Sequence, residues 1–325
     1  GTMKEQTLIY GSTAKLTANA FKKDHYTMTG WNTASDGSGT AYANAAAKPN
    51  MGSAKVPDER LDWLAEYYHP KKYSPATIDF VDVAGVSKGS GKGNALLQTI
   101  RQTDALVHVV RCFDDENIMH VVADASLNVP VDPLGDIETI DLELIMADLE
   151  MVNRRIDKAA KAAKGDKKFL HEVDVFKALA EHLNAGKSAR TFECSDDDKA
   201  LIATSDLLSL KPIIYAANMD EEGVAHAADN KYFRIVTEIA AAEGSQVLPI
   251  CAKAEQEIAE LDDEEKQEFL ADLGIEKSGL EKLIAASYKL LGLMSYLTTG
   301  EDETRAWTIP IGCKAPKAAG KIHSD

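Results

Sequence analysis

Two short segments carry residue types that bind nucleotides. Residues 80–85 read as an apolar strand ending in Asp82-x-x-Gly85, and residues 218–221 follow a second apolar strand. A carboxylate at a strand end can hold Mg²⁺ through water, and the N–H of the glycine after it can contact a terminal phosphate. An amide such as that of Asn218 can hydrogen-bond a purine edge. Together these segments indicate a nucleotide switch protein of the P-loop class.

The loop after Gly85 is rich in glycine but matches neither common phosphate-binding pattern. Residues 87–94 (SKGSGKGN) contain three glycines and two lysines. The Walker pattern needs a serine or threonine after its Gly-Lys pair, and the chain has Gly93 there. The dinucleotide pattern G-x-G-x-x-G fails at Asn94, which disfavours an NAD-binding Rossmann protein. We therefore interpret residues 87–94 as a switch loop.

Two further residues bear on hydrolysis. Val86 follows Gly85 directly, where many switch proteins have a glutamine that orients the attacking water. Valine has no group for that task, so either another residue positions the water or hydrolysis is slow. His120 follows a predicted strand and loop. It is either a structural histidine or a catalytic residue.

The segment expected to contact the base departs from the usual guanine signature. In that signature, Asn-Lys-x-Asp, the aspartate accepts hydrogen bonds from N1–H and the 2-amino group of guanine. Here the segment reads Asn218-Met219-Asp220-Glu221, so a longer glutamate occupies the aspartate position. Because adenine has no 2-amino group, we expect weak guanine selectivity and tolerance of ATP.

The spacing of apolar residues predicts an α/β protein with an inserted helical hairpin. From Pro49 onward strands alternate with helices, which is typical of a parallel sheet. Residues 136–164 and 167–183 have apolar residues at helical spacing around Gly165-Asp166, and this predicts an antiparallel hairpin. The other predicted strands are 78–83, 105–111, 210–217, 246–251 and 305–311, and the other predicted helices are 95–102, 230–243, 262–273 and 279–291.

The composition restricts the partners and the location. The chain has 325 residues and a net charge of −16, which argues against broad electrostatic binding to nucleic acid. No apolar run approaches the roughly 18 residues that a membrane span needs, no cleavable signal pattern is present, and the four cysteines show no C-x-x-C spacing. We expect a cytoplasmic monomer that binds neither DNA nor membranes. The basic concentration Lys158, Lys161, Lys164, Lys167 and Lys168 is either a solvated hairpin tip or a contact for RNA phosphates.

Several stretches between Pro49 and Asp325 are long and unusual in composition. They are residues 57–61, 80–85, 108–113, 132–133 with 136–140, 218–221, 259–265, 305–308 and 315–323. On these stretches the chain resembles the Obg-like ATPases, the YchF family. The resemblance implies a P-loop G domain with a doubly wound, mostly parallel sheet, an inserted antiparallel α-helical coiled coil and a C-terminal, β-grasp-like TGS domain. It also implies association with the ribosome or ribosomal RNA.

The resemblance assigns roles to the residues singled out above. It implies that ATP is preferred over GTP through Asn218 and Glu221, with the backbone of Met219 near the base. It implies slow hydrolysis with a hydrophobic residue in place of the usual glutamine, which Val86 fits. His120 occupies a family loop position that could help to place the water.

The first 48 residues depart from the family pattern. The family's loop Gly-x-Pro-Asn-Val-Gly-Lys-Ser-Thr has no counterpart there, and Gly11-Ser12-Thr13 is the nearest fragment. Ala46 falls where the family has a threonine that ligates Mg²⁺. Residues 29–47 are small and polar and predict a loop, after a short strand at 7–10.

We therefore interpret the chain as a G domain in two parts, residues 1–140 and 206–294, with a helical insertion at 141–205 and an incomplete TGS domain at 295–325. In this interpretation Asp82 holds Mg²⁺ through water, and the Gly85 N–H contacts the γ-phosphate. The expected function is that of a ribosome-associated regulator that binds ATP, binds GTP more weakly and hydrolyses ATP slowly. The alternative is a scaffold that binds the ribosome or protein partners without nucleotide, because the Walker loop is missing.

Overall fold

The computed structural model describes residues 30–32, 41–43, 50–83, 93–116, 118, 130–272 and 274–322. Residues 1–48 form one compact unit and residues 49–325 form a second. In the first unit, β1 (Gly30–Asn32) pairs antiparallel with β2 (Ala41–Ala43). The prediction of loop across residues 29–47 is wrong for these strands, because strand pairing uses backbone groups and needs no apolar periodicity.

The second unit contains every element predicted between residues 78 and 311, together with others that the spacing did not predict. The strands are β3 (Asn50–Lys55), β4 (Lys72–Ser74), β5 (Thr77–Asp82), β6 (Leu106–Arg111), β7 (Ile213–Asn218), β8 (Gln246–Ile250), β9 (Leu293–Thr298) and β10 (Glu303–Pro310). The α-helices are α1 (Glu59–Tyr68), α2 (Gly93–Arg101), α3 (Pro133–Ala163), α4 (Phe169–Asn184), α5 (Asp196–Ala203), α6 (Glu221–Ala225), α7 (Lys231–Glu243), α8 (Ala252–Ile258), α9 (Asp263–Asp272), α10 (Gly279–Leu290) and α11 (Ala315–Ala319). Short 3₁₀ helices lie at Ala189–Thr191 and Ala227–Asp229.

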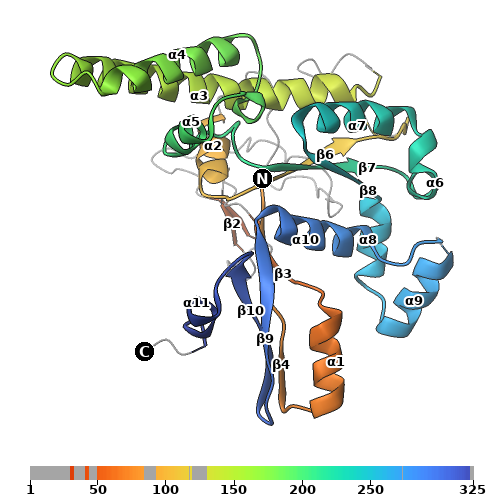
Figure 1. The fold of residues 1–325 in the computed structure, drawn as a ribbon. Helices are drawn as coiled ribbons and strands as arrows, with labels where there is room; N and C mark the ends of the chain where they lie inside the picture. The colour runs from red at the N-terminus through yellow and green to blue at the C-terminus, as the bar shows by residue number, and fades with distance from the viewer. Residues whose placement is uncertain are drawn as a thin grey trace, which may run out of the picture. The chain divides into compact units, whose positions relative to one another are not determined.

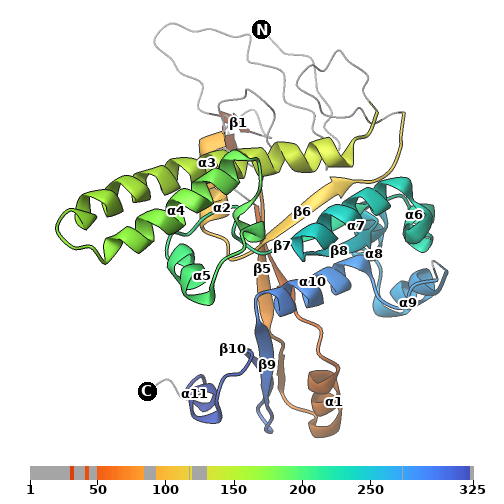
Figure 2. The same cartoon turned by 45° about the horizontal axis from the view of Figure 1, so that its top comes forward.

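A parallel sheet of β6, β7 and β8 lies at the centre of the second unit, with β7 in the middle. Helices α7 and α10 lie on opposite faces of this sheet (Figures 1 and 2). Strand β7 is accordingly buried on both faces, with Ile214, Tyr215 and Ala216 each 0% exposed. A strand covered on both faces is typical of α/β proteins, and the predicted α/β class is confirmed.

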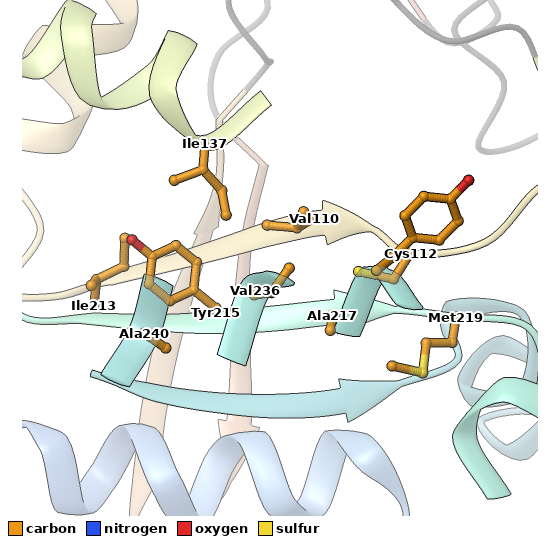
Figure 3. Close-up of a cluster of buried hydrophobic side chains, with 10 residues drawn as sticks. Val110, Cys112, Ile137, Ile213, Tyr215, Ala217, Met219, Val236 and Ala240 are labelled. Carbon is orange, nitrogen blue, oxygen red and sulfur yellow. The ribbon is translucent and has the colours of Figure 1, made fainter. Parts of the chain in front are cut away.

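The main core of the sheet lies between β7 and α7. Figure 3 shows Ile213, Tyr215 and Ala217 of β7 close to Val236 and Ala240 of α7. These alternate residues of β7 share one face because side chains along a strand point to opposite sides in turn. This core holds β7 in the middle of the sheet, and its last residue, Asn218, lies at the carboxyl end.

The sequence predicted a doubly wound, mostly parallel sheet, and among the described strands only β6, β7 and β8 form a parallel sheet of three strands. Among the described strands, β5 pairs with β3 in an antiparallel sheet of its own. A third sheet has the order β4-β10-β9, in which β4 pairs parallel with β10 and β9 pairs antiparallel with it. The sequence analysis predicted neither β4 nor β9. Strand β4 has three residues, too few for a periodic pattern, and its partner β10 is distant in the sequence.

Helices α3 and α4 form the predicted antiparallel hairpin, side by side in Figures 1 and 2. Phe176 and Val152 are 0% exposed in the apolar cluster between the two helices. The fully buried carboxylate of Asp148 on α3 accepts hydrogen bonds from the backbone N–H groups of Leu208 (2.8 Å) and Ser209 (2.7 Å). These bonds tie the hairpin to the segment that leads into β7.

A second buried polar cluster joins the hairpin to the sheet. The guanidinium of Arg190 lies 3.3 Å from both Asp141 on α3 and Glu243 at the end of α7. Glu243 also accepts a hydrogen bond of 2.9 Å from the hydroxyl of Tyr215 on β7, whose ring lies beside the imidazole of His108 on β6. Three parts of the chain that are distant in sequence are therefore held by one network of charges.

Candidate nucleotide-binding site

The carboxyl ends of β6, β7 and β8 meet at one edge of the parallel sheet. Arg111 is paired with Asn218, and Asn218 is paired with Ile250. The backbone carbonyl of Asn218 accepts a hydrogen bond of 2.7 Å from the N–H of Cys112. Ligands of open α/β sheets bind outside the carboxyl ends of the strands, so this edge is the candidate site.

The side chain of Asn218 is fixed by the loop after β8. Its Oδ1 accepts a hydrogen bond of 3.0 Å from the backbone N–H of Ala252. Because that partner is a donor, the atom facing it must be the oxygen, which settles the orientation of the amide. The N–H groups of Nδ2 make no hydrogen bond with a described residue, so two oriented donors remain available to a ligand.

Glu221 lies beside Asn218 and is held by a lysine. Asp220 caps α6 by accepting a hydrogen bond of 2.7 Å from the N–H of Gly223, which places Glu221 in the first turn of the helix. The Glu221 carboxylate lies 2.9 Å from the ammonium of Lys253. This contact raises the pKa of Lys253 above its usual value. Lys253 is exposed and Glu221 is half-buried, so a ligand can reach both charges.

The third predicted contact residue, Met219, lies between these two but faces the interior. Its side chain is 2% exposed and packs in the core cluster between the sheet and α7. Its backbone N–H donates a hydrogen bond of 2.8 Å to the carbonyl of Ile250. Met219 thus anchors the loop to β8, and only its remaining backbone could meet a base.

The structure adds Ala252 and Lys253, which the sequence analysis missed. They follow β8 as part of the segment Cys251-Ala252-Lys253. The only signal for them was their place directly after the third parallel strand, at the same edge of the sheet as Asn218. Nothing in the local pattern indicates which side chains of neighbouring loops contact each other.

The loop after β6 is held by α7. Asn230 caps this helix by accepting hydrogen bonds from the N–H groups of Tyr232 and Phe233, and its Nδ2 donates to the carbonyl of Cys112 at 3.0 Å. The hydroxyl of Tyr232 donates to Asp114 at 2.6 Å and lowers the pKa of that carboxyl. These bonds hold the loop after β6 next to Asn218.

Asp82 ends β5 and is exposed. Its carboxylate makes no hydrogen bond or ion pair with any described residue, including Asn218 and Glu221. Within the described ranges, no group of three or more histidine, cysteine, aspartate or glutamate side chains is arranged to hold a metal. A magnesium ion held mainly by water and phosphates needs only one or two protein carboxylates, which the free carboxylate of Asp82 fits.

The remaining predicted residues lie outside the described part of the chain. These are Gly85, Val86 and His120, together with the strand predicted at residues 7–10. Glu221, Cys251 and Lys282 are among the residues that line a cavity of about 20 Å³. It has room for about one water molecule, which is too little for a nucleotide.

Comparisons with known proteins show close relatives along most of the chain. The ribosome-binding ATPase YchF of Bacillus subtilis is 48% identical over 289 residues, which cover 87% of this chain and 77% of that protein. The protein of the same name from Escherichia coli O157:H7 is 47% identical over 283 residues, covering 86% and 76% of the two chains.

The fold and the C-terminal segment match as well. The solved structure of the Schizosaccharomyces pombe YchF GTPase superposes with a TM-score of 0.75 at 35% identity, covering 86% of this chain and 76% of that one. A family model for the C-terminal part of the YchF GTPases, described as a protein of unknown function (DUF933), matches residues 293–325.

Proposed function

Because this chain belongs to the YchF family, we propose that it binds ATP in preference to GTP, hydrolyses ATP slowly and associates with ribosomes. The observation that carries the proposal is the oriented amide of Asn218, whose oxygen is occupied by Ala252 and whose N–H groups have no described partner. Two fixed amide donors at the carboxyl edge of a parallel sheet suit an acceptor atom on a purine ring.

The preference for ATP follows from the pair of Glu221 and Lys253. The N1–H and the 2-amino group of guanine can donate hydrogen bonds to a free carboxylate, whereas adenine has no 2-amino group. The ammonium of Lys253 at 2.9 Å already neutralises the Glu221 carboxylate, which weakens its attraction for those donors. The longer glutamate also changes the distance between carboxylate and base. Both effects lower the advantage of GTP.

We propose that the phosphates are bound near the end of β5. Asp82 would contact Mg²⁺ through water, since its carboxylate is exposed and has no described partner. A bound Mg²⁺ would offset the negative charge of the phosphates. The N–H of Gly85 would meet the γ-phosphate. Val86 supplies no group to orient water, so hydrolysis would depend on a residue such as His120 and would be slow.

We propose the same division of the chain as the sequence indicated: a G domain from residues 1–140 and 206–294, a helical insertion at 141–205 and a TGS segment at 295–325. Helix α3 crosses the first boundary, since it begins at Pro133. Among the helices that the structure describes, none has the length and apolar character of a membrane span. We place the protein in the cytoplasm because ribosomes are its proposed partner, and we keep the prediction that it is a monomer.

The hairpin tip is the proposed contact with ribosomal RNA. Its lysines at positions 158, 161, 164 and 167 are exposed, whereas Lys168 is paired with Asp166 at 2.8 Å. Unpaired, exposed ammonium groups on a rigid helical arm suit phosphates. Replacing Lys161 and Lys164 by alanine should lower co-sedimentation with ribosomes, and the loss should shrink at high salt. Equal sedimentation of variant and parent would exclude the tip as the contact.

The nucleotide proposal is tested by titrating ATP and GTP into the purified chain. We expect micromolar binding of ATP, weaker binding of GTP and a loss of about 10- to 100-fold in ATP affinity for Asn218→Ala, the size of one or two buried hydrogen bonds. Asn153→Ala is the matched control, because Asn153 is exposed on α3, away from the strand ends. Circular dichroism shows whether each variant is folded.

The alternative function, a scaffold that works without nucleotide, is favoured by one observation. No Gly-x-x-x-x-Gly-Lys-[Ser/Thr] sequence occurs in the chain, and such a loop normally cradles the phosphates. If neither nucleotide binds while the chain still sediments with ribosomes, the scaffold function stands and the ATPase is excluded.

A further inference from the structure

Helix α1 presents an unusual aromatic surface. Trp63, Tyr67 and Tyr68 are 59%, 65% and 51% exposed. The rings of Trp63 and Tyr67 stack with centroids 5.4 Å apart and an interplanar angle of 13°, and Tyr68 meets Tyr67 edge-on at 5.0 Å. We call these three side chains the α1 aromatic patch. A contiguous patch of large apolar side chains exposed to solvent is typical of an interaction site.

The fold does not require this patch. Helix α1 is anchored by Leu61, which is 0% exposed and packs in a core cluster with Val56, Ile284 and Tyr288. Its first turn is capped by Asp58, which accepts a hydrogen bond from the N–H of Arg60 at 3.1 Å. The three aromatic rings lie outside that cluster, so their burial contributes little to the stability of the helix.

The charges around the patch favour a cationic ligand. Glu66, one turn after Trp63, is exposed and makes no ion pair or hydrogen bond with a described residue. The nearby cations are already neutralised: Arg60 by Asp58 at 2.7 Å, Lys71 by Asp302 at 2.7 Å and Lys72 by Glu303 at 3.0 Å. The surface therefore offers aromatic faces and the carboxylate of Glu66, and the three nearby cations are each paired with another carboxylate.

We propose that the α1 aromatic patch binds a basic segment of a partner protein, with an arginine or lysine held between the aromatic faces and the carboxylate of Glu66. Cations are attracted to the faces of tryptophan and tyrosine, and arginine stacks on them. Glu66 and Trp63 are neighbours on the helix surface at this spacing, so one cation can meet both. Single-stranded RNA would also stack on these rings, but its phosphates would be repelled by Glu66 and by a chain of net charge −16.

The proposal is tested with a fluorescein-labelled peptide of alternating arginine and glycine and with a labelled oligouridylate, both without nucleotide or ribosomes. The double variant Trp63→Ala/Tyr67→Ala keeps the charge of the chain, so any loss reports the rings and not the overall field. We expect about 5- to 30-fold weaker peptide binding, the sum of two exposed cation–π contacts. Glu66→Gln should weaken it several-fold by removing one charge.

Met146→Ala is the matched control, because Met146 is an apolar side chain of similar exposure on α3. It should change peptide affinity less than 2-fold, roughly the effect of a surface substitution away from a binding site. The proposal is overturned if the double variant and Glu66→Gln both bind the peptide as tightly as the parent. It is also overturned if the double variant loses oligouridylate binding and retains the peptide, which would make the patch an RNA site. The assay is independent of nucleotide binding, so either proposal can fail alone.

Discussion

Asp141→Asn is expected to make the protein more sensitive to acid, although it replaces a buried charge by a neutral group. Asp141 and His108 lie at opposite ends of the buried network around Arg190. Burial raises the pKa of Asp141 from 3.8 to about 6, against the attraction of Arg190. Burial and the charge of Arg190 lower the pKa of His108 from 6.5 to about 4.

The two shifts have opposite consequences for stability. The neutral His108 of the folded state is favoured at high pH, so its contribution is lost as the pH falls from 6.5 toward 4. The ionised Asp141 disfavours the folded state, and this cost is relieved as the pH falls from 6 toward 3.8. Near pH 5, folding therefore removes a proton from His108 and adds one to Asp141, and the effects of these two groups on stability largely cancel.

The magnitude follows from the two pairs of pKa values. Between about pH 7 and about pH 5 the free energy of unfolding falls by about 1.8 kcal/mol through His108 and rises by about 1.3 kcal/mol through Asp141. The parent protein should lose only about 0.5 kcal/mol from this pair. Asp141→Asn removes the rising part, so the variant should lose about 1.3 kcal/mol more than the parent over the same interval.

Equilibrium urea unfolding at the two pH values, followed by circular dichroism, measures the difference. Asp157→Asn is the control, since Asp157 is an exposed aspartate on the same helix. The difference between variant and parent cancels the contribution of every group that does not interact with Asp141. If Asp141→Asn and the parent lose the same stability between the two pH values, the opposed titration of His108 and Asp141 is refuted.

Two further outcomes are expected. Asp148→Ala should lower the free energy of unfolding by about 2–4 kcal/mol, because the buried N–H groups of Leu208 and Ser209 lose their acceptor. A decrease of less than about 1 kcal/mol, measured by urea unfolding, would contradict this expectation. The thiol of Cys112 is buried, and burial raises its pKa to about 12, so it should resist iodoacetamide in the native chain and react after unfolding. Labelling of Cys112 at the same rate in both states, measured by mass spectrometry of peptides, would disprove that expectation.

The sequence by itself determined the local elements and the residues at their ends. The apolar spacing of residues 136–164 and 167–183 predicted the hairpin of α3 and α4, because helical periodicity is a property of neighbouring residues. The strand that ends at Asn218 and the acidic residue three positions later were visible for the same reason. The sequence also indicated the family, through stretches that each lie within one segment of the chain.

Tertiary structure alone decided which of these segments meet. The hydrogen bond from Ala252 to Asn218 depends on β8 pairing with β7, and the pairing of β4 with β10 joins strands from opposite ends of the second unit. The network likewise joins the charges of Arg190, of Asp141 on α3 and of Glu243 on α7 to the neutral hydroxyl of Tyr215 on β7. Such contacts arise from burial and strand register across long separations, where no short-range pattern names the partner. The α1 aromatic patch is exposed because Leu61 is the residue of α1 that packs in the core, and the sequence alone does not indicate this.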